Sequence, residues 1–318
     1  MDKTDWKVLY ALDKNCRESL NKISRDIRIS RNVALYRIDK MKERGIIRGY
    51  YTEINNLALG YFNVRFFLKL SNASLKEEQE LIDYLLKEKR LMWLSKVFGK
   101  WDIDLVYITK DLFDFQEFKS SLMLKFNRII EEYNVSILTQ IYHYPKDYLI
   151  DNKKTISKSK ALNPNNIKTD KIDIAILRIL SNNADINIVD IAKKTKISIN
   201  TVKSRMNALE KNNIILGYRV LLDTSKLGLQ YFKLHVNHKN YLEQDINKFR
   251  SFLESKNYII YLDQYLGGED FEIELHLKSE NEFLEFMDEL KEKHGHLIKD
   301  HFLIKFSKEY LFKYLPEE

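Results

Sequence analysis

The sequence contains one cysteine, and among its 318 residues there are only three prolines and nine glycines. Cys16 alone can form neither an internal disulfide nor a thiolate cage for a metal, which points to a reducing, cytoplasmic setting. No stretch approaches 18 uncharged apolar residues, so we expect no membrane span. The N-terminal residues carry acids and no apolar core, so we expect no secretory signal.

Motifs of the common enzyme classes are also missing. There is no glycine-rich phosphate loop and no G-x-S-x-G turn, and Cys16 lies in a helical pattern. His294, His296 and His301 are closely spaced, but Gly295 between the first two is typical of a helix terminus, and neither a second cysteine nor an HExxH pattern supports zinc. We therefore expect no enzyme, no metal and no cofactor.

What the chain does have is enough apolar material for packed domains. Hydrophobic residues make up 44% and aromatic residues 12% of the sequence, which excludes wholesale disorder. The length suits two domains or more. The formal net charge is +7, so a polyanionic partner is one class to consider.

The sequence matches itself at a shift of 168 residues. ISRNVALYRIDKMKERGIIRGY at 29–50 aligns with ISINTVKSRMNALEKNNIILGY at 197–218. Gly99-x-x-Asp102 aligns with Gly267-x-x-Asp270, and no gap is needed between these points. Such self-similarity is the signature of duplication.

The first 50 residues of each copy predict three short helices. Ala34, Ile38 and Met41 recur at spacings of three and four, as expected for one buried helix face. Ser30 and Ser198 stand where an N-cap is needed. Gly45, and Asn213 in the second copy, suit a left-handed helix end. Three such helices form a helix-turn-helix unit.

After the helices, both copies change to strand periodicity. Each then predicts the order β-α-β-β-α-β of a ferredoxin-like unit. The fold class is therefore α+β, with two tandem copies of a winged helix-turn-helix unit followed by a βαββαβ domain. The expected divisions are helix-turn-helix units at 1–50 and 169–218, βαββαβ domains at 51–150 and 219–318, and a solvated basic linker at 151–168.

The positive charge is concentrated in the helical units and the linker. Residues 1–50 carry 13 basic and 7 acidic side chains, residues 169–218 carry 8 and 5, and the linker carries 5 and 1. These segments sum to +13, so the two βαββαβ domains together carry −6. A cationic helix-turn-helix unit is expected to neutralise phosphates of double-stranded DNA.

The third helix of each unit is expected to enter the major groove. Asn32 and Asn200 match between the copies and could contact adenine. Arg37 and Arg205 also match, and each could contact a base, contact a phosphate or brace its helix. The predicted DNA-binding residues are Ser30, Arg31, Asn32, Tyr36, Arg37, Lys40, Ser198, Asn200, Thr201, Lys203, Ser204 and Arg205.

These motifs, in this order, resemble the Lrp/AsnC (feast/famine) family of transcription regulators. The resemblance is carried by the helix S-x-x-x-V/A-x-x-R, the G/N-I-I-x-G-Y that follows it, the Leu-Gly strand entry and G-x-x-D. It implies a C-terminal RAM domain that pairs through its sheet and binds a small effector, often an amino acid. By position, the effector-binding residues would be Gly99, Trp101, Asp102, Gly267 and Asp270.

The family usually presents two reading helices by dimerising, and here both lie in one chain. We therefore expect the two RAM-like units to pair as an intramolecular pseudo-dimer, with higher homo-oligomers open. An alternative is a siroheme decarboxylase, a class that also resembles this family, with degenerate helix-turn-helix units. Another is a pure effector sensor, or an architectural chromatin protein with little sequence preference. The sequence alone leaves these alternatives open.

Overall fold

The computed structural model describes residues 1–150, 159–161, 168–239 and 242–316. Each copy begins with three helices and one strand. In the first copy these are α1 (Lys3–Lys14), α2 (Leu20–Asp26), α3 (Arg31–Glu43) and β1 (Ile47–Ile54). In the second copy they are α6 (Lys171–Asn182), α7 (Ile188–Thr195), α8 (Ile199–Lys211) and β7 (Ile215–Leu222). We call these two groups the first and second heads.

The local signals at the third helix act as predicted. The Ser30 hydroxyl accepts the backbone N–H of Val33, and Ser198 does the same for Thr201. Gly45 has φ of 66° and Asn213 has φ of 53°, so in both copies the chain leaves the third helix through left-handed backbone.

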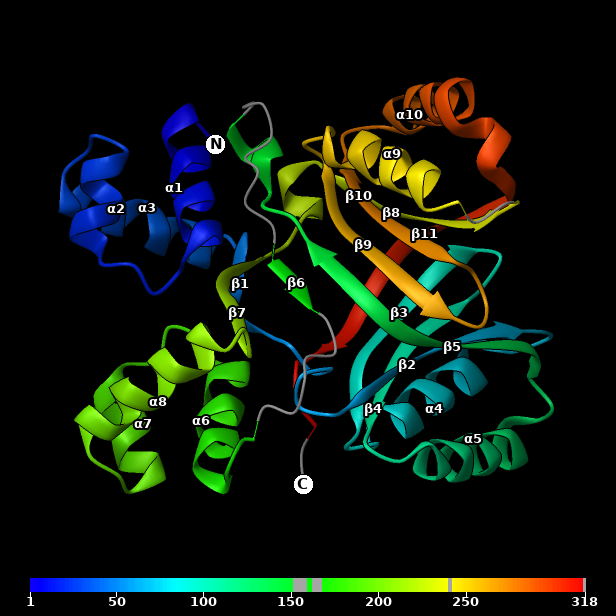
Figure 1. Ribbon diagram of the computed structural model, residues 1–318, viewed down its shortest axis with the longest axis horizontal. Helices are drawn as coiled ribbons and strands as arrows, with labels where there is room; N and C mark the ends of the chain where they lie inside the picture. The colour runs from blue at the N-terminus through cyan, green and yellow to red at the C-terminus, as the bar shows by residue number, and fades with distance from the viewer. Residues whose placement is uncertain (151–158, 162–167, 240–241, 317–318) are drawn as a thin grey trace.

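The two heads are joined by a two-stranded ribbon. β1 and β7 pair antiparallel and lie between the two heads (Figure 1). Each strand packs on helices of the other head as well as on those of its own. Val220 and Leu222 of β7 lie in the core of the first head, whereas Tyr51 and Ile54 of β1 lie in the core of the second. Each head therefore needs a strand from the other copy to complete its core.

The remaining strands and helices follow the predicted β-α-β-β-α-β order twice. The first set is β2 (Phe62–Leu70), α4 (Leu75–Leu85), β3 (Leu91–Gly99), β4 (Ile103–Thr109), α5 (Leu112–Phe126) and β5 (Ile130–His143). The second set is β8 (Gln230–His238), α9 (Glu243–Glu254), β9 (Ile259–Leu266), β10 (Phe271–Leu277), α10 (Glu280–His294) and β11 (Ile298–Phe312). Short 3-10 turns occupy Asp147–Ile150, Ser225–Leu227 and Gly295–Leu297.

These strands do not form two separate ferredoxin-like sheets, and here the prediction needs correction. They run in the order β2-β4-β3-β11-β8-β10-β9-β5, and β5 pairs back onto β2 to close an eight-stranded barrel. The long last strand of each set crosses to the other set, because β11 pairs with β3 and β5 pairs with β9. Closure leaves the eight strands without a free edge.

Each barrel strand has an apolar outer face and a more polar inner face. On β2, Phe66 packs outward against α5, while Arg65 points into the barrel. Helices α4 and α5 cover one side of the barrel, and α9 and α10 cover the other (Figure 1). The period-2 alternation of strands therefore divides a helix-covered core from a charged interior.

Part of the predicted linker lies outside the described residues, namely 151–158 and 162–167. Between these gaps, 159–161 form β6 (Ser159–Ala161), which pairs with β5, so this piece is a strand rather than a plain linker. The expected divisions at residues 50 and 218 fall inside β1 and β7, the strands of the ribbon that packs on the heads. Over the described residues, no helix is long and apolar enough to cross a membrane.

Candidate DNA-binding surface and interior cavity

The third helices α3 and α8 present their outer faces to solvent. Ala34, Ile38 and Met41 are buried as predicted, which leaves the opposite side of α3 open. Tyr36 is 62% exposed. The exposed members of the predicted set are Ser30, Arg31, Asn32, Tyr36, Lys40, Ser198, Asn200, Thr201, Lys203 and Ser204.

The matched arginines are held by acids of the first helix in each head. Arg37 lies 2.8 Å from an oxygen of Asp2 and 2.6 Å from one of Asp5. Arg205 repeats this with Asp170 at 2.6 Å and Asp173 at 3.2 Å. These acids also cap α1 and α6, so each arginine braces its reading helix against the first helix. DNA contact by either arginine stays a prediction.

The predicted effector residues lie in strand-end turns. The Asp102 carboxylate accepts the backbone N–H of Leu70 at 2.8 Å, and Asp270 accepts that of His238 at 2.8 Å. Gly99 and Gly267 have φ of 127° and 79°, which favours glycine. In this arrangement the aspartates fasten neighbouring strands.

Trp101, the other predicted effector residue, lies in the barrel interior. Its ring is 1% exposed and stacks on Phe67 with 5.8 Å between ring centroids. None of the five predicted effector residues lines the cavity described next. Effector binding by these residues therefore stays a prediction.

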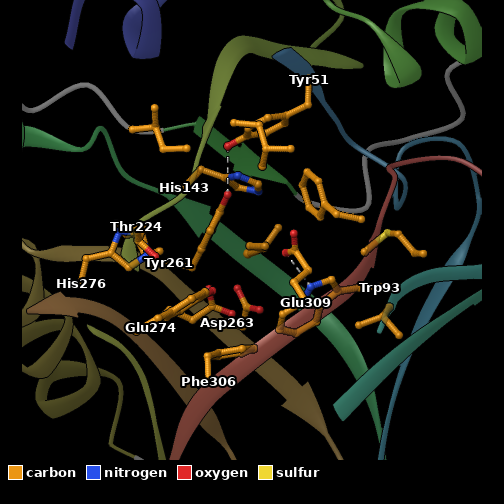
Figure 2. Close-up of a pocket in the computed structure, with 18 of the residues that line it drawn as sticks. Tyr51, Trp93, His143, Thr224, Tyr261, Asp263, Glu274, His276, Phe306 and Glu309 are labelled. Atoms are coloured by element: carbon orange, nitrogen blue, oxygen red, sulfur yellow. Dashed lines mark hydrogen bonds between the residues drawn. The ribbon is translucent and has the colours of Figure 1, made fainter. Parts of the chain in front are cut away.

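A cavity of about 610 Å³ lies between the ribbon and the barrel. Figure 2 shows side chains from the ribbon, such as Tyr51, together with Trp93, Asp263 and Glu274 from barrel strands. Glu309 holds part of its wall in place, because it accepts hydrogen bonds from the Trp93 indole and from Arg48 of β1. The cavity is thus lined both by the ribbon that joins the two heads and by the barrel.

A balanced group of four charges occupies the barrel interior beside this cavity. Arg65 lies 3.1 Å from Asp104 and 2.8 Å from Glu272, and Lys233 lies 3.3 Å from Asp104 and 2.7 Å from Glu272. All four side chains are at most 6% exposed. The repeat shift of 168 relates Arg65 to Lys233 and Asp104 to Glu272, so this quartet is symmetric between the copies.

Two further buried acids stand beside the quartet. Asp263 is 3% and Glu274 is 5% exposed, and with Glu272 their oxygens lie within 4.8 Å of one another. Burial, and the carboxylates of Glu272 and Glu274, raise the pKa of Asp263 well above its usual value. Burial raises the pKa of Glu274 to about 7, although Lys233 opposes the rise.

A second buried network ties the heads to the barrel end. The Arg219 guanidinium of β7 lies 3.2 Å from Glu53 of β1 and donates a hydrogen bond to the backbone oxygen of Asp13 in α1. His143 of β5 lies 3.1 Å from Glu53, and Lys146 lies 2.5 Å from Asp13. Burial acts to raise the pKa of Glu53, but Arg219 and His143 outweigh it and hold that pKa far below its usual range.

Several histidines are buried and uncharged. Burial lowers the pKa of His235 to about 3 and that of His276 to about 3. His276 lies on the cavity wall, where its Nδ1 is 2.7 Å from the Tyr148 hydroxyl. His294 packs against Phe249 and Phe252, so its place near a helix end is a packing role.

The sequence motifs did not indicate the cavity or the charged residues in the barrel interior. The available signal was the alternation of charged and apolar residues in FEIELHL and FNVRFFLKL. Alternation of this kind ordinarily indicates a strand with one solvent-exposed face. Only closure of the barrel turns that polar face inward.

The winged helix-turn-helix class is matched directly by comparison with known families. The model of a winged helix-turn-helix DNA-binding domain matches residues 1–48 and again 169–215. The HTH-type transcriptional regulator Ptr1 of Methanocaldococcus jannaschii is 32% identical over 112 residues, which are 35% of this chain and 74% of that regulator. LrpB of Bacillus subtilis is 24% identical over 148 residues, 46% of this chain and 93% of LrpB.

The chain belongs to the Lrp/AsnC family of HTH-type transcriptional regulators. Its membership agrees with the resemblance drawn from the sequence motifs. DNA binding is the activity that the matched domain class defines.

The whole chain, however, has the fold of an enzyme. The crystal structure of the siroheme decarboxylase NirDL covers 99% of this chain and 94% of its own, with a TM-score of 0.62 and 12% identity. The expectation that the chain is no enzyme is therefore wrong as a flat exclusion. At this identity the likeness is one of fold.

Proposed function

We propose that this protein is a sequence-specific DNA-binding transcription regulator that carries two reading helices in one chain. The observation that carries the proposal is the open outer face of both α3 and α8 in heads with a cationic excess. Exposed Asn32 and Asn200 are the candidates for base contact, and Arg31, Lys40 and Lys203 for phosphate contact.

A tandem fusion of two ancestral copies explains why one chain suffices. The ribbon and barrel make the intramolecular pairing that separate subunits would otherwise make, so the working unit is a pseudo-dimer of domains 1–50 with 51–150 and 169–218 with 219–318. Arg31 and Tyr36 of α3 correspond to Ile199 and Ser204 of α8. Because these exposed side chains differ, the two heads are proposed to read different half-sites. Sedimentation at low concentration tests the pairing, and an obligate dimer of chains would contradict it.

Selection of bound DNA from a random pool tests the regulator proposal. The expected result is two unlike half-sites at a fixed spacing, because one rigid frame holds both heads. Uniform recovery of sequences would favour an architectural protein, and no recovery at low salt would refute DNA binding. Matched Asn32→Ala and Asn200→Ala variants should each relax preference in one half-site alone, by about 1–3 kcal/mol at the contacted base pair.

Siroheme decarboxylation is less well supported by the cavity, because a tetrapyrrole with several carboxylates needs cationic partners. Basic side chains do line the cavity, namely Arg48, Arg65, Lys146, Lys305 and Lys308, but Asp263 and Glu274 place two buried carboxylates beside the quartet on its barrel side. Titration with siroheme tests this. The regulator proposal expects no shift of its absorption spectrum, and a saturable shift lost on His276→Ala would favour the enzyme.

A further inference from the structure

We propose that the cavity between ribbon and barrel binds a small organic cation, an amine on an aromatic or aliphatic body, with Asp263 and Glu274 as its counter-ions. The binding itself is independent of DNA. Its use as a regulatory signal rests on the proposed function. The predicted effector turns take no part in this site.

The first observation in support is that the second copy alone adds two acidic side chains to the barrel interior. The symmetric quartet contains two cations and two carboxylates, so its charges balance. Asp263 and Glu274 correspond by the repeat to Ser95 and Val106 in the first copy. The second copy therefore adds two carboxylates, which share Arg65 (3.8 Å from Asp263) and Lys233 (2.9 Å from Glu274) with the quartet, so two cations face four carboxylates. Buried acids in excess take up protons, or release them when a cation binds from outside.

The second support is an acceptor atom without a partner. Among the described residues, the Oδ1 atom of Asp263 is buried and accepts no hydrogen bond, while its Oδ2 accepts one from the Tyr265 hydroxyl at 3.1 Å. Asp263 lines the cavity, and Figure 2 shows it beside Glu274 with the aromatic wall around them. An ammonium group placed there would donate to the unused oxygen.

The cavity wall identifies an organic body rather than a bare ion. At about 610 Å³ the cavity has the size of a small-molecule site. Tyr51, Trp93, Tyr261 and Phe306 supply aromatic surface to it. Such rings attract ammonium groups through their faces and pack apolar bodies through their area. A metal ion alone would leave most of this surface without a contact.

Binding of a cation should release a proton from Glu274. The groups that face Glu274 are Lys233 at 2.9 Å, the Tyr231 hydroxyl, Arg65, Asp263 and Glu272. With the pKa of Glu274 raised to about 7, the carboxyl must lose its proton to act as a counter-ion. Affinity should therefore rise with pH, by about tenfold from pH 6 to pH 8 for the proton of Glu274 alone. Burial also raises the pKa of Asp263, so a proton released by Asp263 would add to this rise.

The cavity also adjoins the ribbon that joins the two heads. Tyr51 of β1 and Thr224, just after β7, line the same cavity as Asp263. A bound ligand would therefore contact the ribbon that joins the two heads as well as the barrel. A change in DNA affinity on ligand binding requires only that the ligand favour one ribbon position.

Calorimetry on the full chain without DNA tests the site. The probes are pentylamine, phenethylamine and tryptamine, with tryptophol and indole-3-acetate as neutral and anionic partners of tryptamine. At least one amine should bind, and the neutral and anionic partners should bind at least tenfold more weakly than tryptamine if tryptamine is that amine. Failure of all three amines at millimolar concentration, or tighter binding of the anion, would overturn the proposal.

Asp263→Asn should weaken amine binding tenfold or more and flatten its pH dependence. The matched control is Asp288→Asn, which removes an exposed acid of α10 and should leave binding unchanged. Melting followed by circular dichroism shows whether Asp263→Asn folds, and Glu274→Gln gives a second variant with the same expectation. Equal amine binding by both cavity variants and the control, or saturable binding of Mn²⁺ alone that needs Asp263, would also overturn the proposal.

DNA experiments then separate the two proposals. If amines bind but DNA does not, the ligand site stands and the regulator function fails. If DNA binds and the bound amine leaves its affinity unchanged, the site stands and its regulatory use fails.

Discussion

Arg219→Met should strongly loosen the connection between heads and barrel. The variant removes the guanidinium that lies 3.2 Å from the buried Glu53 carboxylate, whereas His143, at 3.1 Å, stays in place. Breaking a buried ion pair by removing one partner costs about 3–5 kcal/mol. At roughly 2 °C per kcal/mol for a chain of this size, the melting temperature should fall by about 6–10 °C.

A second substitution should recover part of this lost stability. Adding Glu53→Gln removes the uncompensated charge and keeps a hydrogen-bonding group near His143, so the double variant should regain about 2 kcal/mol. The deficit of Arg219→Met should also be larger at pH 8 than at pH 5. In the variant, the pKa of Glu53 rises above its unfolded value, so stability is lost as pH increases.

Urea denaturation at the two pH values, with fitted slopes, measures both effects. Arg128→Met, which removes an exposed arginine far from this network, is the control and should change stability by less than about 0.5 kcal/mol. A double variant less stable than Arg219→Met alone would refute this explanation, because it would show that the uncompensated charge of Glu53 does not cause the loss of stability.

Three further outcomes are expected. Arg31→Ala should weaken DNA binding and reduce the slope of log affinity against log salt concentration by about one unit. Arg37→Ala should mainly lower the melting temperature, because its partners are Asp2 and Asp5 of the same head. Equal salt slopes for the two variants would contradict this assignment. Lowering the pH to 5.5 should reduce the free energy of unfolding by about 1 kcal/mol through His276, because burial lowers its folded-state pKa to about 3 and the unfolded state therefore binds the proton first. In urea denaturation, His276→Gln should remove this part of the loss. Gly99→Ala should destabilise more than its repeat counterpart Gly267→Ala, because an added Cβ would lie 2.4 Å from a backbone oxygen at Gly99 but 3.5 Å at Gly267, and thermal melts compare them directly.

Local patterns in the sequence predicted the helices and strands and the buried face of each third helix. The spacing of Ala34, Ile38 and Met41 predicted which face of α3 is buried, because a helix repeats its faces every three to four residues. Ser30 and Gly45 likewise predicted its ends through capping and left-handed backbone. These features depend on neighbours within a few residues, so the sequence alone determined them.

Tertiary structure decided what became of the polar strand faces. Arg65, Lys233 and Glu272 alternate with apolar neighbours, as the residues of a strand with a solvent-exposed face do, yet all three are buried. They are buried because β11 crosses to β3 and β5 crosses to β9, pairings between residues more than 100 positions apart. No local pattern specifies such long-range closure, so the charged interior and its cavity follow from the barrel and not from any motif.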